Sequence, residues 1–245
     1  MKEIRENLSN KLIFGKYKIL KSEGKSICSS VFSGINIINK EYVILKIQDK
    51  KQKYGNLEKE VYYLFQLKGK VIPKVISYGF SGNYNILIEE LLGKSLEQLF
   101  QENRNKPKII RLKDMIMAGI QIIDRLENIH SKNIIHLDIK PNNFLVGKSN
   151  SSLIYIIDFG FAKKYRNSKT GKHIKYSINN HFSGNFKFST VNTMKGVESS
   201  RRDDLESLGY MLIYLYNQEL PWDKIKEKIN LNFHKKYLKL KFWLL

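Results

Sequence analysis

The sequence has a single cysteine, no long apolar run and no internal repeat. Because Cys28 has no partner, the chain cannot form an internal disulfide, which fits a reducing compartment. The N-terminal stretch MKEIRENLSNKL is charged throughout and contains no apolar segment of signal-peptide length. No uninterrupted apolar run approaches the ~20 residues that cross a membrane. We therefore expect a soluble intracellular protein without a membrane span, located in the cytoplasm or in the nucleus.

Acidic residues are also scarce, since 23 Asp and Glu oppose 43 Lys and Arg and leave a net charge of +20. Such a balance suits nucleic acid, an anionic membrane surface, or acidic and phosphorylated proteins as partners. The lysines are spread along the chain, and no zinc-binding or RNA-binding motif accompanies them. We therefore expect no dedicated nucleic-acid binding. Hydrophobic residues at 42% and aromatic residues at 12% indicate a packed globule instead of disorder.

The most informative stretch covers residues 134–160. Its two apolar runs, IIHLDIKPNNFLVG and LIYIIDFG, contain polar groups that a strand core would not favour. Asp138, Lys140 and Asn143 lie in one short loop, and Asp158 ends the second run. Carboxylate and amide oxygens brought together by a hairpin suit Mg²⁺ on a phosphate, while a separate carboxylate can accept a hydroxyl proton. The stretch therefore predicts phosphoryl transfer to an alcohol; an Asx-rich hairpin in an unrelated α+β protein is the alternative.

Three strand-like runs occupy residues 17–49, namely YKILKS, SSVFSGINII and EYVILKIQ, and they indicate an antiparallel meander. The first turn lies where a loop can cover a phosphate, because small residues let backbone N–H groups approach phosphate oxygens. Taken alone, this turn is better interpreted as an ordinary hairpin. Its candidate phosphate-binding residues are Glu23, Gly24, Ser26, Ser29 and Val31.

Lys46 ends an apolar strand, where a lysine is more often an edge charge that reaches solvent. The following helix, predicted over residues 56–68, carries Glu58 and Glu60 in its first half. One of these carboxylates can hold Lys46 against the phosphates of a nucleotide. We favour Glu58 as the partner of Lys46, because Glu60 is displaced from Glu58 by roughly 200° around the helix. The alternative is that both glutamates are solvated and neither contacts Lys46. The apolar face is expected to comprise Leu57, Val61, Leu64 and Phe65.

Two short strands, at residues 75–78 and 84–88, precede a link at residues 90–94. Backbone groups of Glu90 and the side chain of Leu92 are candidates to contact an adenine ring. Beyond the link the pattern is helical, with Ser95 as the N-cap of LEQLFQEN. A helix over residues 109–131 is expected to bury one stripe, made of Ile109, Leu112, Ile116, Ile120, Ile123, Leu126 and Ile129.

Residues 161–200 are polar and lack periodicity, so we interpret them as a segment that receives substrate. The next residues, 204–216, return to a helical pattern whose apolar positions are Leu205, Leu208, Leu212 and Leu215. This helix is apolar enough to form the central element of the second half of the chain.

Residues 15–222 resemble the eukaryotic protein kinases, and specifically the casein kinase 1 family. The resemblance is carried by the H-x-D-x-x-x-x-N and D-F-G motifs, by EELLGKSLE, by KPNNFL, by YIIDFGFAKKYR and, most specifically, by SRRDDLESLGY. It implies a bilobal α+β kinase fold. Residues 1–93 would form an antiparallel β-sheet N-lobe with one main helix, with a hinge at residues 90–94. Residues 94–245 would form a mainly helical C-lobe that lacks its last helices, since the sequence departs from the family after Trp222.

The resemblance also implies a role for each candidate residue. Asp138 would accept the proton, Lys140 would bind the γ-phosphate, and Asn143 and Asp158 would bind Mg²⁺. Lys46, paired with Glu58, would bind the α- and β-phosphates. His136 and Asp204 would support the catalytic loop, and Lys187 would bind an anionic group of the substrate. The implied activity is that of a monomeric, non-receptor serine/threonine kinase. It would use ATP and Mg²⁺ to phosphorylate proteins near acidic or phosphorylated residues, which pair with Arg and Lys.

Three positions near the predicted active site, Leu137, Ile44 and Glu89, depart from the family pattern. Leu137 replaces an arginine that pairs with a phosphorylated activation segment in many kinases, so we expect activity without such phosphorylation. Thr190-Val191-Asn192, by contrast, supports the resemblance, because the casein kinase 1 family also lacks the Ala-Pro-Glu of other kinases and has Ser-Ile-Asn in its place. Ile44 stands where the ATP pocket usually has a small residue, and overpacking of such a pocket costs about 1–3 kcal/mol. Glu89 stands where the pocket usually has an apolar residue, and its buried carboxylate must find a partner or raise its pKa. A pseudokinase that acts as a binding scaffold is therefore the alternative function.

Overall fold

The computed structural model describes residues 8, 11–26, 28–52, 56–69, 71–178, 185–224 and 241. The chain divides into two compact units. Unit 1 comprises residues 1–93 and 147–160, and unit 2 comprises residues 94–146 and 161–245. The sequence-based boundary at residues 90–94 assigns residues 147–160 to the second part, whereas the structure groups them with the first.

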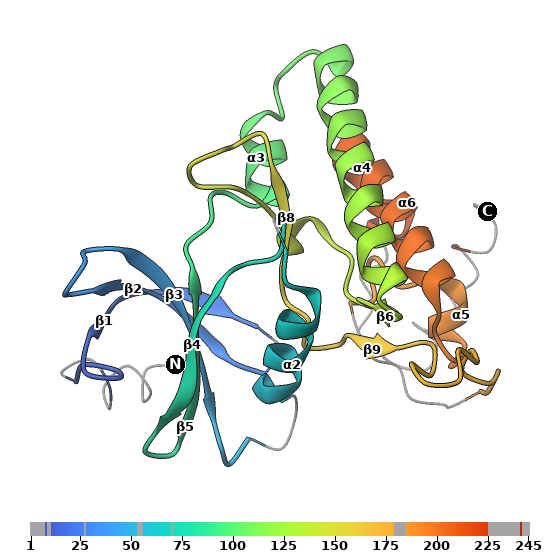
Figure 1. Cartoon of the computed structure of the whole chain (residues 1–245). Coiled ribbons are helices and arrows are strands. Elements are labelled where there is room, and N and C mark those ends of the chain that lie inside the picture. Colours follow the sequence, from blue (N-terminus) through green and yellow to red (C-terminus); the bar gives the residue numbers. More distant parts are fainter. Residues whose placement is uncertain are drawn as a thin grey trace. The chain divides into compact units, whose positions relative to one another are not determined.

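Unit 1 contains a five-stranded antiparallel sheet in the order β1-β2-β3-β5-β4 (Figure 1). This sheet, with one main helix, confirms the fold predicted for the N-terminal part of the chain. The elements of unit 1 are β1 (Tyr17–Lys25), β2 (Ser30–Asn36), β3 (Tyr42–Asp49), α2 (Leu57–Leu67), β4 (Val75–Ser81), β5 (Tyr84–Glu90) and β8 (Ile154–Ile156).

The two faces of this sheet carry different residues, because side chains alternate along each strand. One face of β3 contributes Val43, Leu45 and Ile47 to a buried apolar cluster that also includes residues of β1, β2 and β5. The opposite face carries Lys46 and Gln48. The side-chain oxygen of Gln48 accepts a hydrogen bond from the backbone N–H of Leu57, at 3.0 Å. This bond fixes the start of α2 against the face of the sheet that carries Lys46.

Unit 2 is mainly helical, and its two long helices, α4 and α6, pack against each other (Figure 1). Gly119 allows this approach, since a Cβ atom there would lie 3.3 Å from Cδ2 of Leu212. The predicted cap of α3 is confirmed, because Ser95 and Gln98 form a capping box. The elements of unit 2 are α3 (Leu96–Glu102), α4 (Lys108–Ser131), β6 (Ile134–Ile135), η1 (Pro141–Asn143), β7 (Phe144–Val146), β9 (Lys163–Lys164), α5 (Val191–Met194), α6 (Arg201–Asn217) and η2 (Pro221–Lys224).

The apolar stripe predicted for α4 is only partly buried. Leu126 and Ile129 are fully buried, together with Ile122, which the prediction left out. Four members of the stripe are exposed instead, by 47% to 70%: Ile109, Ile116, Ile120 and Ile123. The prediction of a single buried stripe is therefore wrong for these residues. Isoleucines occupy two faces of this helix, and spacing alone does not distinguish the face that meets α6.

Residues 225–240 and 242–245 lie outside the described residues, so the expected loss of the last helices concerns a part of the chain that the structure does not describe. Lys241 is described and fully buried in unit 2. Its ammonium group donates to the carbonyl oxygens of Phe186 and Ser189 and lies 4.7 Å from the ring centres of Tyr210 and Trp222. In the part of the chain that is described, no helix combines the length and the apolar character needed to cross a membrane.

Candidate functional site

Lys46 is the centre of a buried charged cluster in unit 1. It lies on β3 with 4% of its surface exposed, so it is not the solvent-reaching edge charge of the alternative interpretation. Its ammonium group forms one ion pair with Glu60 of α2 and a second with Glu89 of β5, whose Oε2 lies 3.1 Å from Nζ. Both carboxylates are buried as well. Lys46 is thus held by two elements of the same unit.

The partner of Lys46 on α2 is Glu60, and the prediction of Glu58 is wrong. Glu60 shares the buried face of the helix with Leu57, Val61 and Leu64, at spacings of three and four residues. Glu58 is exposed and lies beside Tyr78. The pKa of the Tyr78 phenol is raised to about 12, mainly by burial of the phenol and in addition by the negative charge of Glu58. The prediction failed because it counted Phe65 in the buried face, whereas that ring is 46% exposed.

The electrostatics of the cluster follow from its burial. Burial disfavours the charged form of Lys46, but the carboxylates of Glu60 and Glu89 outweigh it, and together with Asp158 they raise the pKa of this lysine above its ordinary value. Burial raises the pKa of Glu60 to about 7, although Lys46 opposes the shift. Lys46 is therefore a permanent cation that is shared between two carboxylates.

The turn between β1 and β2 is connected to the strand position of Lys46 by the register of the sheet. Gly24 pairs with Val31 across the turn, and Val31 pairs with Lys46 on the next strand. The turn closes through a hydrogen bond of 2.9 Å from the N–H of Ser26 to the carbonyl of Ser29. Glu23 is exposed and forms an ion pair with Lys21, at 3.5 Å. The predicted phosphate-covering turn thus adjoins the predicted phosphate lysine.

Cys28, at the tip of this turn, is fully buried. Burial, together with the nearby carboxylates of Glu60 and Asp158, raises the pKa of its thiol to about 11, although Lys46 opposes the shift. The thiol therefore stays protonated and unreactive at neutral pH. The same shifts place Cys28 beside the Lys46 cluster.

Asp158 belongs to unit 1 and follows β8. Its φ of 66° lies in the left-handed region, which is uncommon for a residue other than glycine and is concentrated at functional sites. The carboxylate is 7% exposed, and its Oδ1 has no hydrogen-bond partner among the described residues. A buried oxygen of this kind is suited to accept a ligand, which is consistent with the predicted metal role.

The loop after β6, in unit 2, brings Asp138, Lys140 and Asn143 together as predicted. The Oδ2 atom of Asp138 lies 2.6 Å from Nζ of Lys140 and accepts a hydrogen bond of 2.9 Å from Nδ2 of Asn143. The same amide donates to the backbone carbonyl of Asp138, at 2.8 Å. Asp138 is 3% exposed. A carboxylate held beside a cation and an amide can accept a hydroxyl proton next to a phosphate.

Asp204 supports this loop from α6, as the resemblance implied. Its carboxylate accepts the backbone N–H groups of His136 and Leu137, at 2.9 and 2.8 Å. His136 is buried and accepts the N–H of Asp138 on Nδ1, at 3.2 Å. Leu137 has a φ of 66° in the left-handed region, so these two bonds hold a strained backbone immediately before Asp138.

His130 completes this support, although it was not among the residues predicted from the sequence. Its Nε2 lies 2.8 Å from Oδ2 of Asp204, and its carbonyl accepts the hydroxyl of Tyr165, at 2.8 Å. A signal was present, because His130 lies one turn after Leu126 on the buried face of α4. A polar residue on such a face requires a partner.

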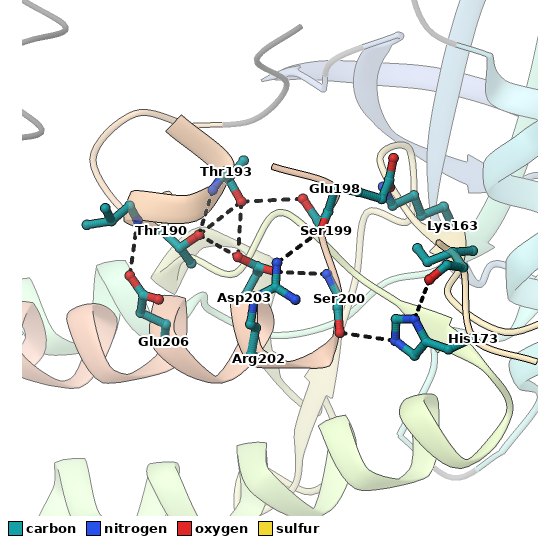
Figure 2. A network of polar contacts seen from close by, with 12 residues as sticks. Lys163, His173, Thr190, Thr193, Glu198, Ser199, Ser200, Arg202, Asp203 and Glu206 are labelled. Carbon is teal, nitrogen blue, oxygen red and sulfur yellow. Dashed lines mark hydrogen bonds and ion pairs between the residues drawn. The ribbon is translucent and has the colours of Figure 1, made fainter. Parts of the chain in front are cut away.

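The end of the predicted substrate-receiving segment is anchored to the start of α6 (Figure 2). Oδ1 of Asp203 accepts the hydroxyls of Thr190 and Thr193, at 2.6 and 3.3 Å, and its Oδ2 accepts the N–H of Ser200, at 2.8 Å. Glu206 accepts the N–H of Val191, at 3.1 Å. Two carboxylates of α6 therefore fix α5, where the chain reads Thr-Val-Asn.

Lys187, the predicted anion site, is already paired within unit 2. Its Nζ lies 2.7 Å from Oδ2 of Asp223 and 3.9 Å from the centre of the Tyr214 ring. An anionic substrate group would have to displace the carboxylate of Asp223. The role of Lys187 in substrate binding remains a prediction.

The predicted hinge residues contribute their backbones to unit 1. The side chain of Glu90 accepts the N–H of Lys74, at 2.7 Å, and the N–H of Glu90 donates back to the carbonyl of Lys74, at 3.1 Å. Leu92 is 8% exposed. Because the carboxylate of Glu90 is engaged, an adenine contact at this residue would use its backbone carbonyl.

Each unit carries side chains of the types that bind Mg²⁺ or the phosphates of a nucleoside triphosphate. In unit 1 Asp158 has carboxylate oxygens, and in unit 2 Asn143 has an amide oxygen, and both are ligand types that Mg²⁺ prefers. Lys46 and Lys140 offer cations for phosphate oxygens. Among the described residues, no group of three or more His, Cys, Asp and Glu could hold a metal by itself.

One comparison with known families bears on this arrangement. The model of the family described as "Protein kinase domain" matches residues 17–243. The match covers both units and continues past Trp222, where the resemblance noted in the sequence ends.

Proposed function

Because the chain belongs to the protein kinase domain family, we propose that it transfers the γ-phosphate of ATP to serine and threonine side chains of proteins. The observation that carries this proposal is the geometry of Asp138. Its buried carboxylate lies between Lys140 and Asn143, and the preceding backbone is anchored on Asp204. Such an arrangement suits a proton acceptor that must remain fixed beside a transferring phosphate.

Each residue then has one task in the reaction. Mg-ATP, when bound, supplies the phosphoryl group and the metal charge that neutralises it. Asp138 orients the acceptor hydroxyl and takes its proton, and Lys140 neutralises charge on the transferring group. Asn143 and Asp158 would hold the metal. Lys46, fixed by Glu60, would bind the phosphates that are left behind.

The finer proposal is a casein kinase 1-like activity on acidic or previously phosphorylated substrates. It is supported by the net charge of +20 and by the resemblance over residues 15–222. Lys187 is the proposed anion-binding residue, with Asp223 occupying its ammonium group in the absence of substrate. Leu137 leaves the catalytic loop without the arginine that responds to a phosphorylated segment, so the activity would need no such modification. We further propose that the protein acts as a monomer.

A catalytically weak scaffold is the second candidate function, and one observation favours it. Two carboxylates already occupy Lys46, and Cys28 is buried beside them. Nucleotide phosphates would therefore meet an ammonium group that is already neutralised. The complete set of Lys46, Asp138, Asn143 and Asp158 favours the enzyme.

The test is transfer of ³²P from labelled Mg-ATP to acidic peptides that differ only in their acceptor, which is Ser, Thr or Tyr. We expect incorporation with Ser and Thr, none with Tyr, and none with the Asp138→Asn variant. A second peptide set, with lysines in place of the acidic residues, tests the substrate preference. Equal incorporation by the wild-type protein and Asp138→Asn would overturn the proposed activity.

A further inference from the structure

Lys46 is contacted by one more carboxylate than it can neutralise. An ammonium group has one positive charge and three N–H donors. Glu60 and Glu89 each take one donor, and together they carry two negative charges when ionised. All three side chains are at most 5% exposed, so water neither screens these charges nor replaces a lost partner.

The second carboxylate is placed by the register of the sheet. Glu89 of β5 pairs with Ile44 of β3, which puts it diagonally across from Lys46 on the same face. Diagonal neighbours lie within reach of long side chains. The contact therefore follows from two strand positions and does not depend on α2, which supplies Glu60.

The cluster also contains buried oxygens that the described residues leave without a hydrogen-bond partner. They are Oε2 of Glu60, Oε1 of Glu89 and Oδ1 of Asp158. Buried oxygen atoms without a donor are costly, so the arrangement is not optimised for stability alone.

We propose that Glu89 is an internal competitor of the nucleotide phosphates for Lys46 and thereby sets the affinity for Mg-ATP. This inference rests on the proposed function, because it assumes that Lys46 binds nucleotide phosphates. When the phosphates bind, Lys46 exchanges Glu89 for a phosphate oxygen and keeps Glu60. The exchange costs affinity twice, since one ion pair is broken and a buried carboxylate remains near the incoming anion.

Glu89 weakens the binding of the phosphate groups and does not affect the binding of the nucleoside. Neutralising Glu89 without changing its shape should therefore tighten binding of ATP and leave binding of adenosine unchanged. A residue that merely blocked the adenine pocket would instead affect both ligands to the same extent. This contrast separates the proposed role from a steric one.

The experiment measures binding of Mg-ATP and of adenosine by titration calorimetry to the full chain and to Glu89→Gln. We expect the Kd for Mg-ATP to fall at least tenfold in Glu89→Gln and the Kd for adenosine to change less than twofold. The KM for ATP in the phosphotransfer assay should fall by a similar factor. Glu41→Gln is the matched control, because Glu41 is an exposed carboxylate of the same unit that hydrogen-bonds Asn39; its Kd values should equal those of the wild type.

Glu89→Met is a second variant, to be used in case Glu89→Gln does not fold. The methionine side chain has a similar length but carries neither a charge nor a hydrogen-bond donor. It should show the same selective gain for Mg-ATP. An unchanged or larger Kd for Mg-ATP in the folded variants would overturn the inference while leaving the kinase activity in place. So would an equal gain for adenosine. If neither the wild type nor the variants bound Mg-ATP, the proposed function itself would fail, and the inference with it.

Discussion

Lys46 and Glu60, 14 positions apart in the sequence, form an ion pair whose side chains are only 5% and 0% exposed. The pair joins β3 to α2 and fixes the lysine that is proposed to bind phosphate. Glu60 is thus the partner of Lys46 in place of Glu58, which was the partner expected from the sequence. Because the two glutamates lie two positions apart on one helix, a substitution of Glu58 is a matched control for the same substitution of Glu60.

We predict that Glu60→Gln lowers kcat/KM for ATP by about 10- to 100-fold, because a misplaced phosphate lysine loses orientation. Glu58→Gln should change it less than twofold, since this carboxylate is exposed and does not contact Lys46. Steady-state kinetics at several ATP concentrations measure both. A loss of activity in Glu58→Gln as large as that in Glu60→Gln would contradict the assignment.

Asp204→Asn tests the anchor of the catalytic loop. The amide that replaces the carboxylate can accept only one of the two backbone N–H groups, and the other is left buried without a partner. We expect a loss of about 2–3 kcal/mol in the free energy of unfolding. Urea unfolding measures it, with Asp124→Asn, an exposed position on α4, as the control. A variant as stable as the wild type would show that the anchor is dispensable.

The ammonium of Lys241 makes stability depend on pH. Burial lowers its pKa from 10.5 to about 7, although Glu206 opposes the shift. Between these two values the unfolded chain binds the proton and the folded protein does not, so stability rises with pH from about 7 toward 10.5. The slope contributed by one such group is at most about 1.4 kcal/mol per pH unit.

Lys241→Met should remove this slope. Urea midpoints at pH 7, 8 and 9 would then rise less steeply than those of the wild type, whereas the exposed Lys175→Met would keep the wild-type slope. Parallel slopes in wild type and Lys241→Met would exclude a deprotonated lysine at this position.

The two faces of α4 predict opposite outcomes for neighbouring isoleucines. Ile122→Ala should cost about 2–5 kcal/mol of stability, because Ile122 is fully buried in the apolar interior. Ile120→Ala should change stability by less than about 0.5 kcal/mol, since Ile120 is 54% exposed. Thermal unfolding of both variants checks the difference. A large loss in Ile120→Ala would place that residue in a buried interface.

Much of the fold was predictable because local signals were strong. Alternating apolar residues and turn residues located all five strands of the unit 1 sheet, and Ser95 marked the start of α3. The short loop from Asp138 to Asn143 needed no long-range information, since its residues are at most five positions apart. These features depend on neighbours in the sequence.

The errors arose where long-range packing decided the outcome. Glu60 and Glu58 are the same residue type, and the apolar pattern was misleading because Phe65, counted in the buried face of α2, is exposed where the helix packs on the sheet. Ile120 and Ile122 present the same problem on α4. The pairing of Glu89 with Lys46 required the register between β3 and β5, which no local pattern in the sequence specifies.

The hydrogen bonds from His136 and Leu137 to Asp204 also impose an order of events on the folding chain. They connect residues 68 and 67 positions apart, so they form only after a large loop has closed. During synthesis, the loop that carries Asp138 leaves the ribosome well before the helix that holds it. A nascent chain that stops before residue 204 therefore contains Asp138, Lys140 and Asn143 but lacks the carboxylate that anchors the backbone before Asp138, and this anchor forms only when α6 has folded.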